Sequence, residues 1–183
     1  MSKDKLSVFI SLILRHKPSE IGITLDNHGW ADVNELIDGI NRSGRSIDMK
    51  LLEEIVKTDN KGRYSFNEDK TLIRANQGHS IPVDVGLKEV IPPDILYHGT
   101  AMRFIDSIKQ QGIKSMSRLY VNLSKDLDTA IKVGNRHGKS VVLRIDTKKM
   151  FEEGIKFYLS ENGVWLTKFV DWKYVKGFEC TEE

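Results

Sequence analysis

Three of the four prolines of this chain lie within the stretch 81–94, IPVDVGLKEVIPPD. Proline fixes φ and lacks a backbone N–H, so such a stretch continues neither a helix nor the interior of a sheet. It predicts a boundary, and we take 85–94 as a linker between lobes at 1–84 and 95–183. With 183 residues, 39% of them hydrophobic, each lobe can form a core of its own.

The first lobe begins with apolar residues at helical spacing. Val8 and Leu12 fall on the same row of a helix as Arg15, and Phe9 on the row of His16. We therefore expect Arg15 and His16 to end the buried stripe. Cations near a helix C-terminus are otherwise explained by the helix dipole. A guanidinium at the end of an apolar stripe suits an anion such as phosphate, and the adjacent imidazole can donate a hydrogen bond or exchange a proton.

Capping residues and apolar periodicity predict the rest of the first lobe. Pro18 and Gly22 end the first helix, and 23–26 (ITLD) is expected to be a short strand. Asp32 and Asp48 are expected to cap a second and a third helix. A hairpin follows, with RYSF and TLIRA flanking the turn NEDK. Short helices followed by a hairpin predict a winged-helix-like lobe, a layout often used on nucleic acid.

The second lobe is predicted to combine helices and strands, which gives an α+β chain. ILYHGT, RLYVNLS and SVVLRID are typical of strands, whereas AMRFIDSIKQQG and DLDTAIKVG are typical of helices that end at a glycine. KFYL, GVWLT and YVKGFE add further β-type residues, so we expect a compact sheet. No G-x-G-x-x-G follows a strand, which disfavours a Rossmann site.

Charge and cysteine content narrow the function classes. The net charge is +2, and residues 1–90 carry 13 basic against 14 acidic side chains, so a nucleic acid must be attracted by a few placed arginines. Cys180 is the single cysteine, which excludes an internal disulfide and a thiolate cluster. The histidines form no H-E-x-x-H pair, so we expect no metal. The N-terminal apolar run is short and has no cleavage site, so we expect a soluble, cytoplasmic protein without a membrane partner.

Further polar residues stand at expected element boundaries. Arg63 and Arg74 flank the hairpin and Arg118 precedes LYVNLS; each alone is typical of solvated surface. Together with Arg15 and Arg63, however, Arg118 can complete a phosphate clamp. The run 76–80 (NQGHS) fits an ordinary turn or a polar interface between lobes.

The tripeptide His98-Gly99-Thr100 lies between a predicted strand and a predicted helix. Its plain explanation is a turn in which Thr100 caps the helix. Backbone N–H groups at a helix N-terminus can also bind a pyrophosphate, and His98 can reach a ribose hydroxyl. The tripeptide is therefore a candidate nucleotide site.

Six motifs occur in order along the chain: LRHKP, IRANQGHS, LYHGT, the arginine ahead of LYVNLS, GNRHG and ENGVWLT. The set resembles the RNA 2′-phosphotransferase family, of the tRNA 2′-phosphotransferase type, over nearly the whole chain. The resemblance implies an N-terminal winged-helix-like lobe that holds phosphorylated RNA and a C-terminal ADP-ribosyltransferase-like lobe that holds NAD⁺. It implies an essential set, Arg15, His16, Arg63 and Arg118. It also implies an NAD⁺ site that includes His98, Gly99, Thr100, Ser124, Gly134 and Arg136.

The resemblance further implies a two-step reaction that needs no metal. The RNA 2′-phosphate attacks C1″ of the nicotinamide ribose and expels nicotinamide; O2″ then attacks phosphorus. The products are RNA with a free 2′-OH and ADP-ribose 1″,2″-cyclic phosphate. We expect a monomeric, NAD⁺-dependent enzyme acting on RNA with a 2′-phosphate, as in tRNA splicing. Tyr120 and Asn122 stand where many relatives have histidine; neither readily exchanges a proton at neutral pH, so we expect no acid–base role there.

Two other functions remain open from the sequence. An ADP-ribosyltransferase would keep the NAD⁺ lobe but modify a protein, a nucleic acid terminus or a small phosphate without the second step. A non-enzymatic winged-helix module would only sense NAD⁺ through its second lobe. Nicotinamide release that depends on a 2′-phosphorylated RNA would exclude the second of these.

Overall fold

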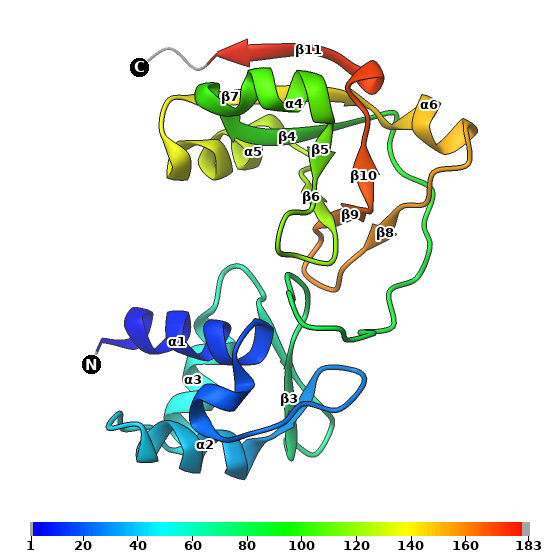
Figure 1. Ribbon diagram of the computed structural model, residues 1–183. Coiled ribbons are helices and arrows are strands. Elements are labelled where there is room, and N and C mark those ends of the chain that lie inside the picture. Colours follow the sequence, from blue (N-terminus) through cyan, green and yellow to red (C-terminus); the bar gives the residue numbers. More distant parts are fainter. Residues whose placement is uncertain (1, 181–183) are drawn as a thin grey trace. The chain divides into compact units, whose positions relative to one another are not determined.

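The computed structural model describes residues 2–180, apart from the side chains of residues 137, 179 and 180, so the thiol of Cys180 lies outside the described part. The chain forms two compact units, Met1–Gly86 and Leu87–Glu183 (Figure 1). Both units contain helices and antiparallel sheet, which confirms the α+β class. Among the described residues, no helix combines the length and the apolar character that crossing a bilayer requires.

Unit 1 packs its helices on one side of a small antiparallel sheet (Figure 1). The helical elements are α1 (Lys3–Arg15), η1 (Pro18–Ile21), α2 (Val33–Arg42) and α3 (Met49–Thr58). The strands are β1 (Trp30–Asp32), β2 (Tyr64–Phe66) and β3 (Leu72–Ala75), paired in the order β1-β3-β2. The expected hairpin is therefore confirmed as β2 and β3.

The expected helix caps of unit 1 are confirmed, but one expected strand is wrong. The carboxylates of Asp32 and Asp48 accept backbone N–H groups at the starts of α2 and α3, at 3.0 and 2.7 Å. Residues 23–26 form no strand. They lead instead into a turn in which the Asp26 carboxylate accepts the N–H of Trp30 at 2.9 Å. Pairing thus begins at Trp30, after the turn and not before it.

The buried face of α1 differs from the expected one. Leu6, Ile10 and Ile13 are buried, whereas Val8 is 70% exposed. At about 100° per residue, Arg15 shares the face of Val8 and lies opposite Leu6. The expectation that the row of Val8 and Arg15 faces the core is therefore wrong, whereas Phe9 and Ile13, on the row of His16, are buried as expected. The cover of Arg15 must come from a segment outside the core.

Unit 2 divides its strands among small antiparallel sheets with the orders β11-β7-β4, β6-β9-β8 and β10-β5. The expectation of one compact sheet is wrong in this respect. The strands are β4 (Ile95–Ala101), β5 (Ile113–Lys114), β6 (Val121–Leu123), β7 (Ser140–Asp146), β8 (Tyr158–Leu159), β9 (Trp165–Thr167), β10 (Phe169–Val170) and β11 (Val175–Cys180). The helical elements are η2 (Met102–Phe104), α4 (Ile105–Gln111), α5 (Leu127–Gly134), η3 (Asn135–His137), α6 (Thr147–Glu152) and η4 (Trp172–Tyr174).

Two glycines let α5 lie directly against the sheet of β4 and β7. A Cβ at Gly99 of β4 would stand 1.8 Å from the carbonyl oxygen of Ala130 in α5. A Cβ at Gly134 would stand 2.2 Å from Oγ of Ser140 in β7. Both positions therefore need glycine for close packing, whatever ligand unit 2 binds.

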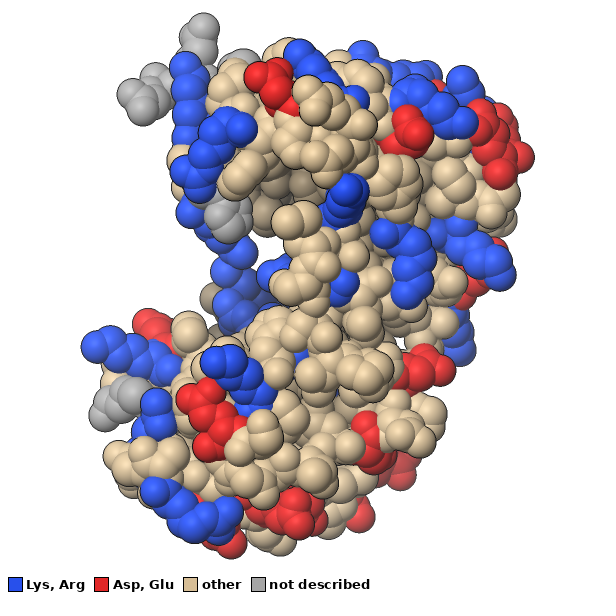
Figure 2. Space-filling model, in the orientation of Figure 1, with Lys and Arg blue, Asp and Glu red and all other residues tan. Residues whose placement is uncertain are grey.

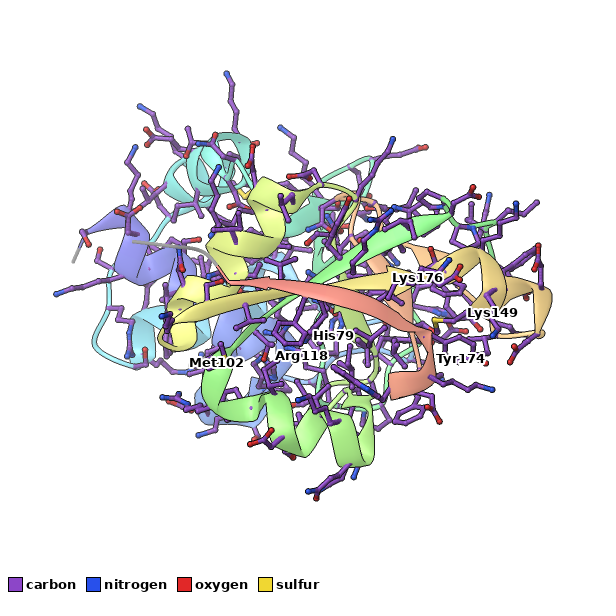
Figure 3. All side chains as sticks on the ribbon, turned by 90° about the horizontal axis from the view of Figure 1, so that it is seen from above. His79, Met102, Arg118, Lys149, Tyr174 and Lys176 are labelled. Carbon is purple, nitrogen blue, oxygen red and sulfur yellow. The ribbon has the colours of Figure 1, made fainter. Side chains whose placement is uncertain are left out.

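A group of charged side chains joins α6 to the last strand of unit 2. Lys149, Tyr174 and Lys176 lie together at the end of the unit away from Met102 (Figure 3). The Tyr174 hydroxyl donates to the Glu153 carboxylate, and Lys176 Nζ lies 2.8 Å from a carboxylate oxygen of Asp146. These contacts hold α6 against η4 and β11.

Candidate functional site

In unit 1, a short segment that follows β3 is bonded to the residue that precedes β2. Tyr64 pairs with Ala75 in the hairpin, so Arg63 and Asn76 lie side by side. The Asn76 N–H donates to the Arg63 carbonyl at 2.9 Å, and its Nδ2 donates to the Gly62 carbonyl at 2.8 Å. The hairpin therefore fixes the backbone of Arg63 at the beginning of the segment 76–80.

The other end of the segment 76–80 covers the end of α1. The Ser80 N–H donates to the Arg15 carbonyl at 3.0 Å, and Ser80 Oγ lies 2.9 Å from Nδ1 of His16. Gly78 has φ +89°, and a Cβ built there would lie 3.6 Å from Cζ and Nε of Arg15. The segment thus contacts Arg63 at one end and Arg15 and His16 at the other, and it supplies the cover that the core does not give to Arg15.

His79 is an uncharged group among these cations. Its side chain is 2% exposed, and burial, with the positive charges of Arg15 and His16 beside it, lowers its pKa to about 4. Within the described residues its buried Nε2 has no hydrogen-bond partner. Gly29 gives this atom room, since a Cβ there would lie 3.4 Å from it. At neutral pH His79 therefore adds no positive charge beside Arg15.

Arg74 has a structural position, so its interpretation as solvated surface is wrong. Its guanidinium lies 4.5 Å from the centroid of the Trp30 ring, and Nη1 donates to the Val85 carbonyl at 3.2 Å. Arg74 thus connects β3 with β1 and with the end of the unit. Arg63 is half-buried and paired with Asp59, so it too differs from a freely solvated arginine.

His98, Gly99 and Thr100 lie inside β4 and not at a helix N-terminus. They pair with residues 141–143 of β7. The next element, η2, has Ala101 as its N-cap and receives no side-chain cap. The expectation of a pyrophosphate site on helix N–H groups at this tripeptide is therefore wrong, because the strand continues to Ala101.

The ring of His98 is oriented by the neighbouring strand β6. Its Nδ1 lies 3.1 Å from the backbone carbonyl oxygen of Asn122, and a carbonyl can only accept. Burial lowers the pKa of His98, partly opposed by this hydrogen bond. The neutral imidazole therefore keeps its proton on Nδ1 and leaves Nε2 as an acceptor. Ser124 directly follows β6 and exchanges two backbone hydrogen bonds with Tyr97 of β4, at 2.8 and 2.9 Å.

The other predicted residues of unit 2 fall into buried and exposed positions. Thr100 is buried in β4, and Gly99 and Gly134 provide the close contact of α5. Arg136 is exposed in η3, and Arg118 is exposed in the turn before β6. Only the arginines of this group therefore present charged side chains to solvent.

The turn that carries Arg118 is held by contacts that the sequence does not indicate. Lys168 Nζ donates to the carbonyl of Leu119 at 3.4 Å and lies 3.9 Å from the centroid of the Tyr120 ring. Tyr120 in turn packs edge-to-face against Tyr158, with ring centroids 5.5 Å apart. Tyr120 thus has partners that fix the turn, which suits an anchoring residue.

Charge is distributed without a uniform sign on the described surface. On the face of each unit drawn in Figure 2, basic and acidic side chains are interspersed. Among the residues whose side chains are described, no three His, Cys, Asp or Glu side chains come together as possible metal ligands. Unit 1 therefore has no broad basic surface on this face, and its candidate anion-binding groups are Arg15 and Arg63, the arginines that contact the segment 76–80.

Comparison with known proteins places the chain. Residues 1–169 match the family described as RNA 2′-phosphotransferase, Tpt1 / KptA family. The chain belongs to this family. A relative from Fusobacterium nucleatum is 61% identical over 173 residues, which covers 94% of this chain and 97% of the relative. Relatives from Flavobacterium johnsoniae (51% over 171 residues; 93% and 94% covered) and Escherichia coli K12 (47% over 172 residues; 91% and 94% covered) are also similar.

Each of these relatives carries the curated name "Probable RNA 2'-phosphotransferase". The resemblance drawn from the six sequence motifs is thereby confirmed. Membership of the RNA 2′-phosphotransferase family agrees with the arginines of unit 1, since arginine is a residue type suited to binding phosphate. It leaves the roles of individual residues to be argued from their contacts.

Proposed function

We propose that this protein removes an internal 2′-phosphate from RNA by transferring it to the ADP-ribose part of NAD⁺. The products are RNA with a free 2′-OH, nicotinamide and ADP-ribose 1″,2″-cyclic phosphate. Family membership supports the RNA 2′-phosphate as substrate. The observation that carries the proposal is the segment 76–80, which is bonded to Arg63 at one end and to Arg15 and His16 at the other.

Unit 1 is the RNA-binding, winged-helix-like lobe in this proposal. Arg15 and Arg63 donate to the oxygens of the phosphate dianion, for which the planar guanidinium is well suited. One ring nitrogen of His16 faces Ser80 Oγ, which directs the other ring nitrogen to hold the phosphate or to move a proton. Neutral His79 supports Arg15 without adding a charge.

Unit 2 is the NAD⁺-binding, ADP-ribosyltransferase-like lobe in this proposal. The neutral form of His98, with its proton on Nδ1, offers Nε2 to a ribose hydroxyl, and such an acceptor fits a nucleotide ribose. Ser124 and the exposed Arg136 contact the same ligand, while Gly99, Thr100 and Gly134 shape the β4–α5 wall. When bound, NAD⁺ supplies an electrophilic ribose carbon with nicotinamide as leaving group. Arg118 offsets negative charge on the phosphate during transfer.

The variants Arg15→Ala and His16→Ala test the proposal. Neither side chain belongs to the hydrophobic core, so both variants should remain folded. Each should lose at least about 100-fold in 2′-phosphate removal, the scale of losing one electrostatic contact in a transition state. Arg42→Ala, at the exposed end of α2, is the matched control and should keep full activity. Full activity in both test variants would refute the assignment.

A second candidate function keeps the NAD⁺ lobe and changes the acceptor. The oriented, neutral His98 favours binding of a ribose but does not select the molecule that receives ADP-ribose. Incubation with NAD⁺ and either proteins or phosphorylated acceptors separates the two functions. A stable ADP-ribosylated product supports the second candidate, whereas release of ADP-ribose 1″,2″-cyclic phosphate supports the transfer proposed above.

A further inference from the structure

The carboxylate of Asp59 binds Arg63 through both of its oxygens. One oxygen accepts the backbone N–H of Arg63 at 2.5 Å, and the other is paired with Nη1 of the Arg63 guanidinium. The Asp59 side chain is only 4% exposed, compared with 28% for that of Arg63. Asp59 is thus a buried anion whose two shortest hydrogen bonds go to Arg63, and the N–H of Lys61 donates to the same side chain at 3.5 Å.

The loop that carries both residues is fixed from two sides. The Gly62 N–H donates to the Asp59 carbonyl at 2.9 Å, which closes a turn, and Gly62 has φ +52°. The Asn76 side chain and N–H bind the carbonyls of Gly62 and Arg63, as described above. The backbone of Arg63 is therefore held by several bonds, whereas Asp59 is the described side chain that fixes the direction of its guanidinium.

We propose that Asp59 is a positioning residue that orients Arg63 for the RNA 2′-phosphate. The inference rests on the proposed function, since Arg63 is there a phosphate ligand. A guanidinium has five N–H donors in a planar fork, and holding one nitrogen leaves the remaining donors in a defined direction. Arginine otherwise loses rotamer freedom when it binds a ligand, and a preorganised side chain avoids that cost. Asp59 also reduces the net charge beside the phosphate, so its contribution is direction and not added attraction.

Asp59→Asn separates the effect on the direction of Arg63 from the effect on net charge. It keeps the size of the side chain but removes the negative charge and one of the two acceptor oxygens. An Asn amide has one oxygen and one NH₂ group, so it cannot place an acceptor at both of the positions that Oδ1 and Oδ2 of Asp59 occupy. One of the two bonds must be lost, and the short backbone bond is the more constrained. We expect Asp59→Asn to lower kcat/KM about 10- to 100-fold, the cost of a small misplacement of a catalytic group. Asp59→Glu keeps the charge and both acceptors and should recover part of this loss.

A double-mutant comparison distinguishes positioning from a general effect on the loop. If Asp59 acts through Arg63, then Asp59→Asn should change kcat/KM by less than about twofold when Arg63 is already alanine. An Asp59→Asn effect of the same size in both backgrounds would overturn the proposal. The matched control is Asp69→Asn: Asp69 also accepts a backbone N–H within a turn, that of Thr71 at 3.0 Å, but it lies away from Arg63. This control should retain wild-type kcat/KM.

The experiment is a turnover assay of the full chain with NAD⁺ and RNA that carries one 2′-phosphate. No turnover by the wild-type protein would contradict the proposed function and not the role of Asp59. Wild-type activity with a strongly impaired Arg63→Ala and a fully active Asp59→Asn would overturn only the role of Asp59. Loss of the fold in both Asp59→Asn and Asp59→Glu, measured by circular dichroism, would also overturn it, because Asp59 would then serve the loop itself.

Discussion

Acidification should destabilise unit 1 through His79. Burial and neighbouring positive charge hold its folded-state pKa at about 4, against the usual 6.5 for an unfolded chain. The unfolded state therefore binds a proton between these pH values that the folded state does not bind, and stability falls as the pH falls. At about 1.4 kcal/mol per pKa unit, the full difference is about 3 kcal/mol. By linkage, about 2 kcal/mol of it should be lost between pH 7.5 and pH 5.

The perturbation that isolates this effect is His79→Gln, which removes the titrating imidazole and keeps a polar side chain. Urea unfolding of both proteins at pH 7.5 and pH 5 gives two free energies of unfolding for each. The wild-type protein should lose about 2 kcal/mol more than the variant over this interval. Hydrogen exchange of amides in β3 should show the same difference locally, because β3 belongs to unit 1. An equal loss in both proteins would refute the reasoning that His79 is kept neutral by its surroundings.

Three further predictions follow from the packing and from the ring of His98. Gly99→Ala should lower the free energy of unfolding of unit 2 by about 3 kcal/mol in urea, because the added Cβ would stand 1.8 Å from the Ala130 carbonyl oxygen. Gly177→Ala is the control: its Cβ would have no neighbour within 4 Å, so the free energy of unfolding should change by no more than about 0.5 kcal/mol. Ile10→Ala should cost about 2–4 kcal/mol and Val8→Ala about 0.5 kcal/mol or less; equal costs would contradict the observed buried face of α1. His98→Leu removes the Nε2 acceptor and should raise KM for NAD⁺ about 5-fold, as steady-state kinetics at saturating RNA can measure.

Local sequence signals predicted those parts of the fold that are decided locally. Asp32 and Asp48 cap α2 and α3 because a cap needs only its own carboxylate and an N–H three residues later. Helical periodicity correctly put Val8 and Arg15 on one face of α1, but it could not tell which face the core would cover. That choice depends on where other elements pack. The two-residue strands β5 and β10 were missed for the same reason, because they are strands only through their pairing with each other.

The candidate site shows the same division. The motifs predicted that Arg15, His16 and Arg63 belong together, and hairpin pairing explains how the segment 76–80 reaches all of them. The helix start expected at Thr100 was wrong because β-pairing with β7 extends the strand past the point where the sequence changes character. Asp59 was overlooked although an aspartate shortly before a glycine–arginine pair is a recognisable turn pattern. Lys168 had no local signal, because it contacts a carbonyl 49 residues earlier in the chain.

The most direct test of the account is the stoichiometry of the reaction. Wild-type protein is mixed with NAD⁺ and either a short RNA that carries one internal 2′-phosphate or the same RNA with a 2′-OH, and nicotinamide and RNA phosphate are measured together. The account predicts one nicotinamide released for each 2′-phosphate removed, and none with the 2′-OH RNA. Phosphate removal without NAD⁺, or nicotinamide release that ignores the 2′-phosphate, would contradict it.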